Sequence, residues 1–249
     1  MGPEFTSPFA RFADRLASLS PVGPEERFAL LALSGAIIQV RAGTDLVPPG
    51  DRAAYVHLVV EGLVGRFAQF SDGKRQITAV HLPSDVADLH AVARPMLAPA
   101  LQTLTTATLV RIPLATMINL ARANPAVAEA FWAYCAVDTA VLERWAANLG
   151  CRAASQRMAH FLCEIGLRVE CAGRGHRLDF AFDVTQPQLG EALGLTPVHV
   201  NRTLRALREQ GILEITGRRY QVLNWDALVA VGDFDPLYLL LDGPQRQAA

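Results

Sequence analysis

The chain has 249 residues, of which 51% are hydrophobic, and its formal net charge is −1. This length is enough for two ordinary domains, and we find no uninterrupted apolar run of about 18 residues that would form a membrane span. The N-terminus lacks a basic region followed by an apolar run, so we expect a cytoplasmic protein without a secretory signal.

Charge is distributed unevenly along the chain. Residues 150–224 hold ten arginines against seven acidic residues, a balance of +3. Residues 1–149 have a balance of −1, and the remaining C-terminal residues have −3. A local basic excess is the electrostatic signature of nucleic-acid binding, so residues 150–224 are the candidate region for that function.

The four cysteines do not form a metal-binding pattern. They are spaced without a C-x-x-C pair, whereas zinc and iron–sulfur sites usually contain close cysteine pairs. We therefore interpret all four as reduced thiols, partly buried in helices. They are Cys135, Cys151, Cys163 and Cys171.

The N-terminal half is predicted to be rich in strands. Short helical patterns over residues 8–33 precede a β-rich region at residues 36–113. Glu61-Gly62 and Asp72-Gly73 are hairpin-turn signals between strand-like runs, and their spacing is typical of an antiparallel barrel or jelly roll. The predicted strands are Ile37–Val40, Ala54–Val60, Leu63–Phe70, Gln76–His81 and Thr103–Ile112.

A long helix is predicted over residues 124–149, beginning at Asn124-Pro125. Its apolar stripe is too long for a lone surface helix. A core helix within one chain is one interpretation, but the near-heptad spacing favours packing against a second copy. The stripe consists of Val127, Phe131, Tyr134, Val137 or Asp138, Val141, Leu142, Trp145 and Leu149.

A compact series of short elements follows the long helix. A helix is predicted over residues 152–169, and a loop with glycine and arginine leads to a strand over residues 178–184. After a two-helix motif at residues 185–213, a second hairpin is predicted. Its strands are Ile212–Ile215 and Arg219–Leu223, around Thr216-Gly217-Arg218. A hairpin directly after a two-helix motif is typical of a winged helix-turn-helix.

The two-helix motif contains the signals of two helix starts and a sharp turn. Thr185 and Thr196 are placed as N-caps, and Pro187 and Pro197 lie in the first turns, where a missing N–H costs nothing. Gly194 can adopt the positive φ that the turn requires. The predicted core residues are Leu189, Ala192, Leu193, Val200, Leu204 and Leu207. The polar side of the second helix then remains free, as in helices that enter the major groove.

These residues resemble the Crp–Fnr family of transcription regulators, relatives of the cyclic-AMP receptor protein. The matching pattern is Gln188-Leu189-Gly190-x-x-Leu193-Gly194-Leu195-Thr196-x-x-x-Val200-x-Arg202-x-Leu204-x-x-Leu207-Arg208-x-x-Gly211-x-Leu213. The resemblance implies an α+β fold with a cyclic-nucleotide-binding-like antiparallel β-barrel (jelly roll), a long dimerisation helix and a winged helix-turn-helix. The expected boundaries are 6–123 for the sensory barrel, 124–150 for the dimerisation helix, 151–232 for the DNA-binding domain and 233–249 for a C-terminal tail.

The resemblance also implies a function and its site residues. We expect a homodimer that binds a palindromic operator in double-stranded DNA, with RNA polymerase as a candidate partner. Val198, His199 and Arg202 occupy the base-reading positions, and the Arg202 guanidinium can bond both acceptors of a guanine edge. The cyclic-AMP receptor has glutamate at the position of Val198, so we expect a different operator. Candidates for phosphate contacts are Ser155, Thr185, Gln186, Gln188, Thr196, Asn201, Arg205, Arg218 and Arg219.

The sensory barrel departs from the pattern of cyclic-nucleotide binders. Those proteins have a Gly-Glu-Leu stretch, whose glutamate binds the ribose, followed by Arg-Ser or Arg-Thr, whose arginine holds the phosphate. Residues 82–90 and 97–100 have no glutamate near position 89 and no arginine near 97–98, and Arg94 lies on the wrong side of Pro95. A buried phosphate without a cation is costly, which argues against cyclic AMP.

The cysteines and histidines of the N-terminal half bear on other effectors. Residues 1–134 contain no cysteine, which argues against the N-terminal iron–sulfur cluster of Fnr-type oxygen sensors. His57, His81 and His90 leave a haem- or redox-responsive regulator open, although a histidine in a β-rich core is more often a hydrogen-bonded core residue. A small apolar effector, or no effector at all, completes the alternatives.

Two other function classes are disfavoured. The chain has no G-x-S-x-G, Walker, G-x-G-x-x-G or H-E-x-x-H motif, so we do not expect an enzyme. A protein-interaction module with a purely structural two-helix unit is the remaining class, and the polar residues at positions 199, 201, 202 and 205 argue against it. We expect the acidic, aromatic segment at residues 233–238 to dock on the body of the protein, with contact to a partner as the alternative.

Overall fold

The computed structural model describes residues 7–96 and 99–241 in two compact units. Unit 1 comprises residues up to Val64, His81–Thr139 and the chain from Leu240, and unit 2 comprises Gly65–Val80 and Ala140–Leu239. Residues 6, 97–98 and 242–249, on which some of the expectations fall, lie outside the described residues. No helix within the described ranges is long and apolar enough to cross a membrane.

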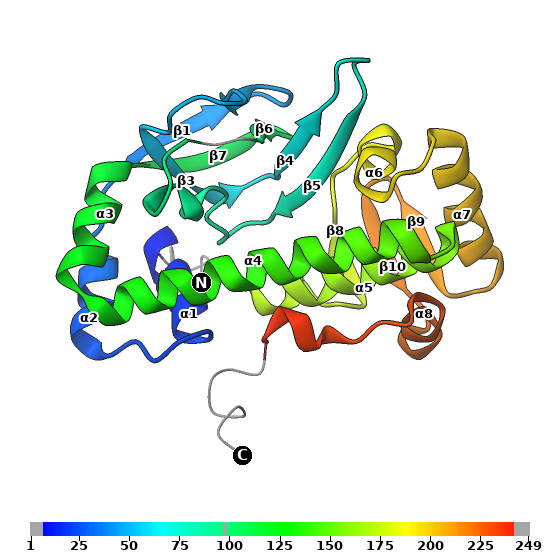
Figure 1. Cartoon of the computed structure of the whole chain (residues 1–249). Helices are drawn as coiled ribbons and strands as arrows, with labels where there is room; N and C mark the ends of the chain where they lie inside the picture. The colour runs from blue at the N-terminus through cyan, green and yellow to red at the C-terminus, as the bar shows by residue number, and fades with distance from the viewer. Residues whose placement is uncertain (1–6, 97–98, 242–249) are drawn as a thin grey trace. The chain divides into compact units, whose positions relative to one another are not determined.

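Unit 1 combines short helices with antiparallel strands (Figure 1). One sheet has the strand order β1-β7-β3, and β2 pairs antiparallel with β6. The strands are divided among open sheets rather than closed into a barrel, which corrects the expected barrel closure while the α+β class is confirmed. The elements are α1 (Pro8–Ala17), α2 (Pro24–Leu31), β1 (Ala36–Val40), β2 (Asp45–Val47), β3 (Tyr55–Glu61), η1 (Leu89–Val92), β6 (Ala100–Thr103), β7 (Ala107–Pro113), α3 (Leu114–Ala123) and the first half of α4 (Pro125–Cys151).

The run Thr103–Ile112 is two strands, not the single strand that was predicted. The backbone bends between β6 and β7, where the Leu104 N–H donates to the Leu63 carbonyl at 2.9 Å. The Thr105 hydroxyl accepts from the Leu63 N–H at 2.8 Å. These bonds satisfy the polar groups that a continuous ladder would have used, so the chain turns without leaving a buried donor unpaired.

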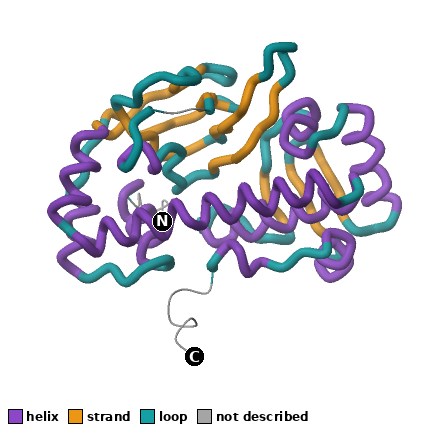
Figure 2. Tube along the Cα trace, viewed as in Figure 1, coloured by secondary structure: helices purple, strands orange, loops and turns teal. Residues whose placement is uncertain are grey.

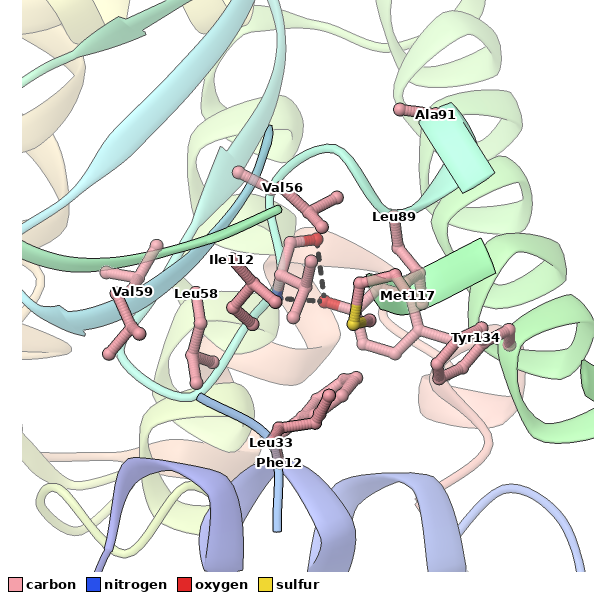
Figure 3. Packing of buried hydrophobic residues seen from close by; sticks show 14 of the residues in the cluster. Phe12, Leu33, Val56, Leu58, Val59, Leu89, Ala91, Ile112, Met117 and Tyr134 are labelled. Atoms are coloured by element: carbon pink, nitrogen blue, oxygen red, sulfur yellow. Dashed lines mark hydrogen bonds between the residues drawn. The ribbon is translucent and has the colours of Figure 1, made fainter. Parts of the chain in front are cut away.

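The core of unit 1 joins its helices to its sheet. Phe12 of α1 lies between aromatic residues of α4, with ring centroids 6.2 Å from Phe131 and 6.5 Å from Tyr134. The Tyr134 hydroxyl accepts from the Val86 N–H at 3.0 Å, a bond drawn dashed in Figure 3. Met117 and Leu58 are fully buried in the same cluster.

The apolar stripe of α4 faces the chain's own core. Val127, Phe131 and Tyr134 belong to the buried cluster of unit 1. In unit 2, the Trp145 ring lies 5.3 Å from Phe161 and its indole N–H donates to Glu164 at 2.8 Å. Most of the stripe therefore packs within the chain, whereas Leu142 of the same stripe is 39% exposed. Packing of α4 against a second copy stays a prediction.

Unit 2 holds the winged helix-turn-helix and a hairpin from earlier in the chain. Its small sheet has the strand order β8-β10-β9, with Tyr220 opposite both Phe180 and Ile215. These short strands lie among helices in Figure 2. The elements are β4 (Val64–Gln69) and β5 (Arg75–His81), then α5 (Ala154–Cys171), β8 (Asp179–Ala181), α6 (Gln186–Leu193), α7 (Pro197–Glu209), β9 (Leu213–Thr216), β10 (Arg219–Val222), α8 (Trp225–Gly232) and η2 (Pro236–Leu239).

The turn between α6 and α7 depends on two glycines. Gly194 has φ +61°, which confirms the left-handed turn position. At Gly190, an added Cβ would lie 2.4 Å from the Leu195 carbonyl oxygen, a backbone atom that cannot rotate away. At Gly190 the first helix therefore approaches the turn that follows it too closely for a side chain.

Gly190→Ala is expected to lower the free energy of unfolding of unit 2 by about 1–3 kcal/mol, because the backbone must shift to admit the methyl group. Gly150→Ala is the matched control, since an added Cβ there meets nothing within 4 Å and alanine favours a helix. Urea denaturation of both variants checks the prediction. Equal stability of the two variants would contradict it.

The segment at residues 233–239 docks on α5, as expected from the sequence. Phe234 and Tyr238 pack against the His160 ring, with centroids at 4.9 Å and 5.9 Å. The Tyr238 hydroxyl donates to Glu164 at 2.8 Å. The helix α8 before this segment was not predicted, and Asn224 caps it by accepting from the Ala227 N–H at 3.0 Å.

Acid is expected to weaken this docking through His160. Burial lowers the pKa of His160 from 6.5 to about 4, so the unfolded chain binds a proton first as the pH falls. The neutral ring thus contributes stability that is complete above pH 6.5 and lost as the pH falls towards 4, by up to about 3 kcal/mol. Denaturation of the wild type and of His160→Gln between pH 7 and 4 checks this, and an unchanged pH dependence in the variant would refute it.

Candidate nucleic-acid interface

The recognition helix α7 begins with a capped and exposed first turn. The Thr196 hydroxyl accepts from the His199 N–H at 3.3 Å, which confirms Thr196 as the N-cap. The same hydroxyl lies 3.1 Å from Nδ1 of His199, so the ring is held at the helix start. Val198 is 76% exposed and has no contact with the core.

Four of the five candidate DNA-contacting residues of α7 lie on one face of the helix. Val198, Asn201, Arg202 and Arg205 follow the i, i+3, i+4, i+7 spacing of a single helix face, and all four are exposed. His199 is also exposed but lies about 100° around the helix from Val198. The opposite face is buried through Val200, Thr203, Leu204 and Leu207. The helix thus presents a continuous polar surface with an apolar tip.

The remaining phosphate candidates of the helices lie at helix starts. Ser155 is exposed in the first turn of α5, and Gln186 is exposed in the first turn of α6. Thr185 caps α6, and it exchanges hydrogen bonds with the half-buried Gln188, whose Oε1 accepts from the Thr185 N–H at 2.8 Å. Backbone N–H groups at these starts are suited to bind phosphate.

Carboxylates pair with three exposed arginines of this surface, Arg205, Arg218 and Arg219. Arg218 pairs with Asp183, and the Arg219 guanidinium lies 2.6 Å from Asp179. The hydrogen bond from Arg219 holds the pKa of Asp179 below its usual value. Arg205 pairs with Glu209 one turn on. Sequence reasoning missed these acidic partners, although the i, i+4 spacing of the α7 pair was a visible signal.

In unit 1, the segment that would hold a cyclic nucleotide is bonded to β3. The Asp88 carboxylate is fully buried and accepts from the His57 backbone N–H at 2.7 Å, while its other oxygen lies 2.7 Å from His57 Nδ1. The Ala87 N–H donates to the His57 carbonyl at 3.0 Å. The Asp88 carboxylate is thus bonded within unit 1, and residues 97–98, where the resemblance places the phosphate-binding arginine, lie outside the described residues.

The comparisons with known proteins agree with this surface. Residues 156–231 match the model of a protein family described as the Crp-like helix-turn-helix domain. The probable transcriptional regulator flp of Lacticaseibacillus casei is 30% identical over 193 residues, which are 75% of this chain and 82% of that protein. The nitrogen fixation regulation protein FixK of Azorhizobium caulinodans is 28% identical over 69% of this chain and 68% of its own length.

The solved structure of FixK2 from Bradyrhizobium japonicum has the same architecture. It is 29% identical, with a TM-score of 0.74 over 80% of this chain and 98% of its own. The capped two-helix motif, the wing and these similarities lead to one assignment. The chain belongs to the Crp–Fnr family of transcription regulators, with a C-terminal helix-turn-helix that binds DNA.

Proposed function

We propose that this regulator binds a two-fold-symmetric operator as a homodimer. We also propose that it acts through DNA binding and has no catalytic activity. The exposed face of α7 carries the proposal, because its apolar tip and cations stand clear of the core. In a two-fold dimer, the two recognition helices read half-sites about one helical turn apart. Selection from random duplex DNA tests this, and a selected pool without a two-fold-symmetric site would contradict it.

The face of α4 opposite its buried stripe is our candidate dimer surface. Trp132 is 66% exposed there, and Ala136, Thr139 and Glu143 follow at spacings of four, three and four residues. This alternation is the repeat of a two-helix seam. Trp132→Glu should yield monomers in native mass spectrometry. Phe28→Glu, at an equally exposed aromatic residue on α2, is the control and should leave the dimer intact.

We further propose an effector other than cyclic AMP, supported by the sequence, which has no arginine near positions 97–98 and no glutamate near position 89. A regulator that binds DNA without any effector, or one that responds to haem or redox state, is an alternative outcome. Native mass spectrometry of the purified protein distinguishes these, since it reports retained ligand and dimerisation together. Because its partner is chromosomal DNA, we place the protein in the cytoplasm, with RNA polymerase as a candidate partner.

Asp179 and Asp183, which pair with the wing arginines, are expected to limit binding to random DNA. Asp179→Asn with Asp183→Asn removes two charges that pair with Arg219 and Arg218, which leaves both guanidinium groups free for phosphates. The slope of log affinity against log salt should then steepen by up to about 2. Fluorescence anisotropy on a random duplex measures it. Glu214→Gln, an exposed carboxylate on β9, is the control, and an identical slope in all variants would count against the prediction.

A further inference from the structure

A hairpin from early in the chain makes three contacts with the first helix of the helix-turn-helix. The hairpin is β4–β5, and the helix is α6, 116 residues further along the chain. Both lie within unit 2. Arg75 donates to one oxygen of Glu191 through NH2 at 2.8 Å and through Nε at 3.3 Å. Gln76 donates to the Ala192 carbonyl at 3.1 Å.

These contacts are better organised than an ordinary surface ion pair. The Arg75 and Glu191 side chains are only 23% and 29% exposed. The guanidinium also lies 4.4 Å from the centre of the Phe67 ring on the same hairpin, which fixes its orientation before it meets Glu191. An arginine that is already oriented loses less side-chain entropy when it forms the pair.

The contacts also suit the end of the helix at which they occur. Ala192 is in the last turn of α6, where the carbonyl groups have no partner within the helix. Gln76 satisfies one of these carbonyls, and the Arg75 cation complements the negative end of the helix dipole. The candidate phosphate contacts, Thr185 and Gln186, are at the opposite end of α6, so the hairpin leaves them uncovered.

We propose that Arg75 and Gln76 are positioning residues for DNA binding, which hold the C-terminal end of α6 and thereby the helix-turn-helix in its binding arrangement. The tight packing at Gly190 couples the position of α6 to that of α7, because α6 and the turn before α7 meet there without space for a side chain. Both strands of the hairpin continue into unit 1 at Val64 and His81, so the hairpin that contacts α6 is covalently continuous with that unit. This inference rests on the proposed DNA-binding function.

The test uses the full-length protein and the duplex returned by selection. Arg75→Ala should weaken binding to that duplex about three- to tenfold, because a loosened α6 must be ordered on binding. Lys74→Ala is the matched control, since it removes the same charge from the same hairpin, and the Lys74 ammonium pairs with the exposed Asp72 rather than with α6. Arg75→Glu and Glu191→Arg should each weaken binding, and the double variant should recover it.

Each outcome decides the proposal. Weaker binding with an unchanged salt slope, rescue in the double variant and faster hydrogen exchange of α6 amides support it. Unchanged or tighter binding by Arg75→Ala overturns it. A salt slope that becomes shallower by about 1 in Arg75→Ala would indicate a direct phosphate contact and would also overturn it. If the wild type binds no specific duplex, the proposed function fails, whereas unchanged hydrogen exchange in Arg75→Ala refutes the contact itself.

Discussion

Arg202→Ala is expected to weaken operator binding by about 1–3 kcal/mol, roughly 5- to 150-fold, while binding to random DNA changes little. Arg202 is exposed on the face of α7 that also carries Val198, and within the described part of the chain no carboxylate forms an ion pair with it. A guanidinium that is free of an acidic partner can form both hydrogen bonds to a guanine edge. Arg202→Ala should therefore reduce the preference for the operator over random DNA.

The matched control is Arg208→Ala, on the same helix. Arg208 is also exposed but lies in the last turn of α7, away from the helix start that enters a groove. Competition anisotropy with operator and random duplexes gives the ratio of the two affinities for each variant. A similar loss of operator affinity in both variants, or equal losses on both duplexes in Arg202→Ala, would assign Arg202 to the phosphate backbone instead.

The DNA-binding motif could be predicted from sequence because its signals are local. Thr185 and Thr196 cap the helices that directly follow them, and Gly194 supplies the turn between them. Each signal acts over three or four residues, so neighbouring residues determine where each helix begins and where the chain turns. The candidate residues Val198 and Arg202 follow from the same short stretch.

Contacts between distant segments could not be predicted in this way. The apolar stripe of α4 was visible, but periodicity does not tell which surface covers it, and Phe131 proved to face α1 of its own chain. Arg75 and Glu191 are 116 residues apart, and Tyr238 and Glu164 are 74 apart. The sequence around a surface arginine does not predict its partner, because only the folded structure brings the two residues together.

The buried Glu164 is expected to be the most sensitive position for stability among these long-range contacts. Its side chain is fully buried and accepts from Trp145 and Tyr238 at 2.8 Å each, and from Arg168 at 3.1 Å. Glu164→Ala leaves the Arg168 cation and two buried donors without this partner. Removal of one member of a buried ion pair costs about 3–5 kcal/mol, so the variant should unfold at much lower urea concentration.

Glu170→Ala separates this effect from the loss of any carboxylate on α5. Glu170 also pairs with an arginine, Arg177, but its side chain is 27% exposed and that of Arg177 is 42% exposed. Water compensates both groups, so its loss should cost less than about 1 kcal/mol. Glu164→Gln keeps an acceptor oxygen without the charge, so its loss in the free energy of unfolding should lie between those of Glu164→Ala and Glu170→Ala. A loss in Glu164→Ala no larger than in Glu170→Ala would show that Trp145, Tyr238 and Arg168 find other partners.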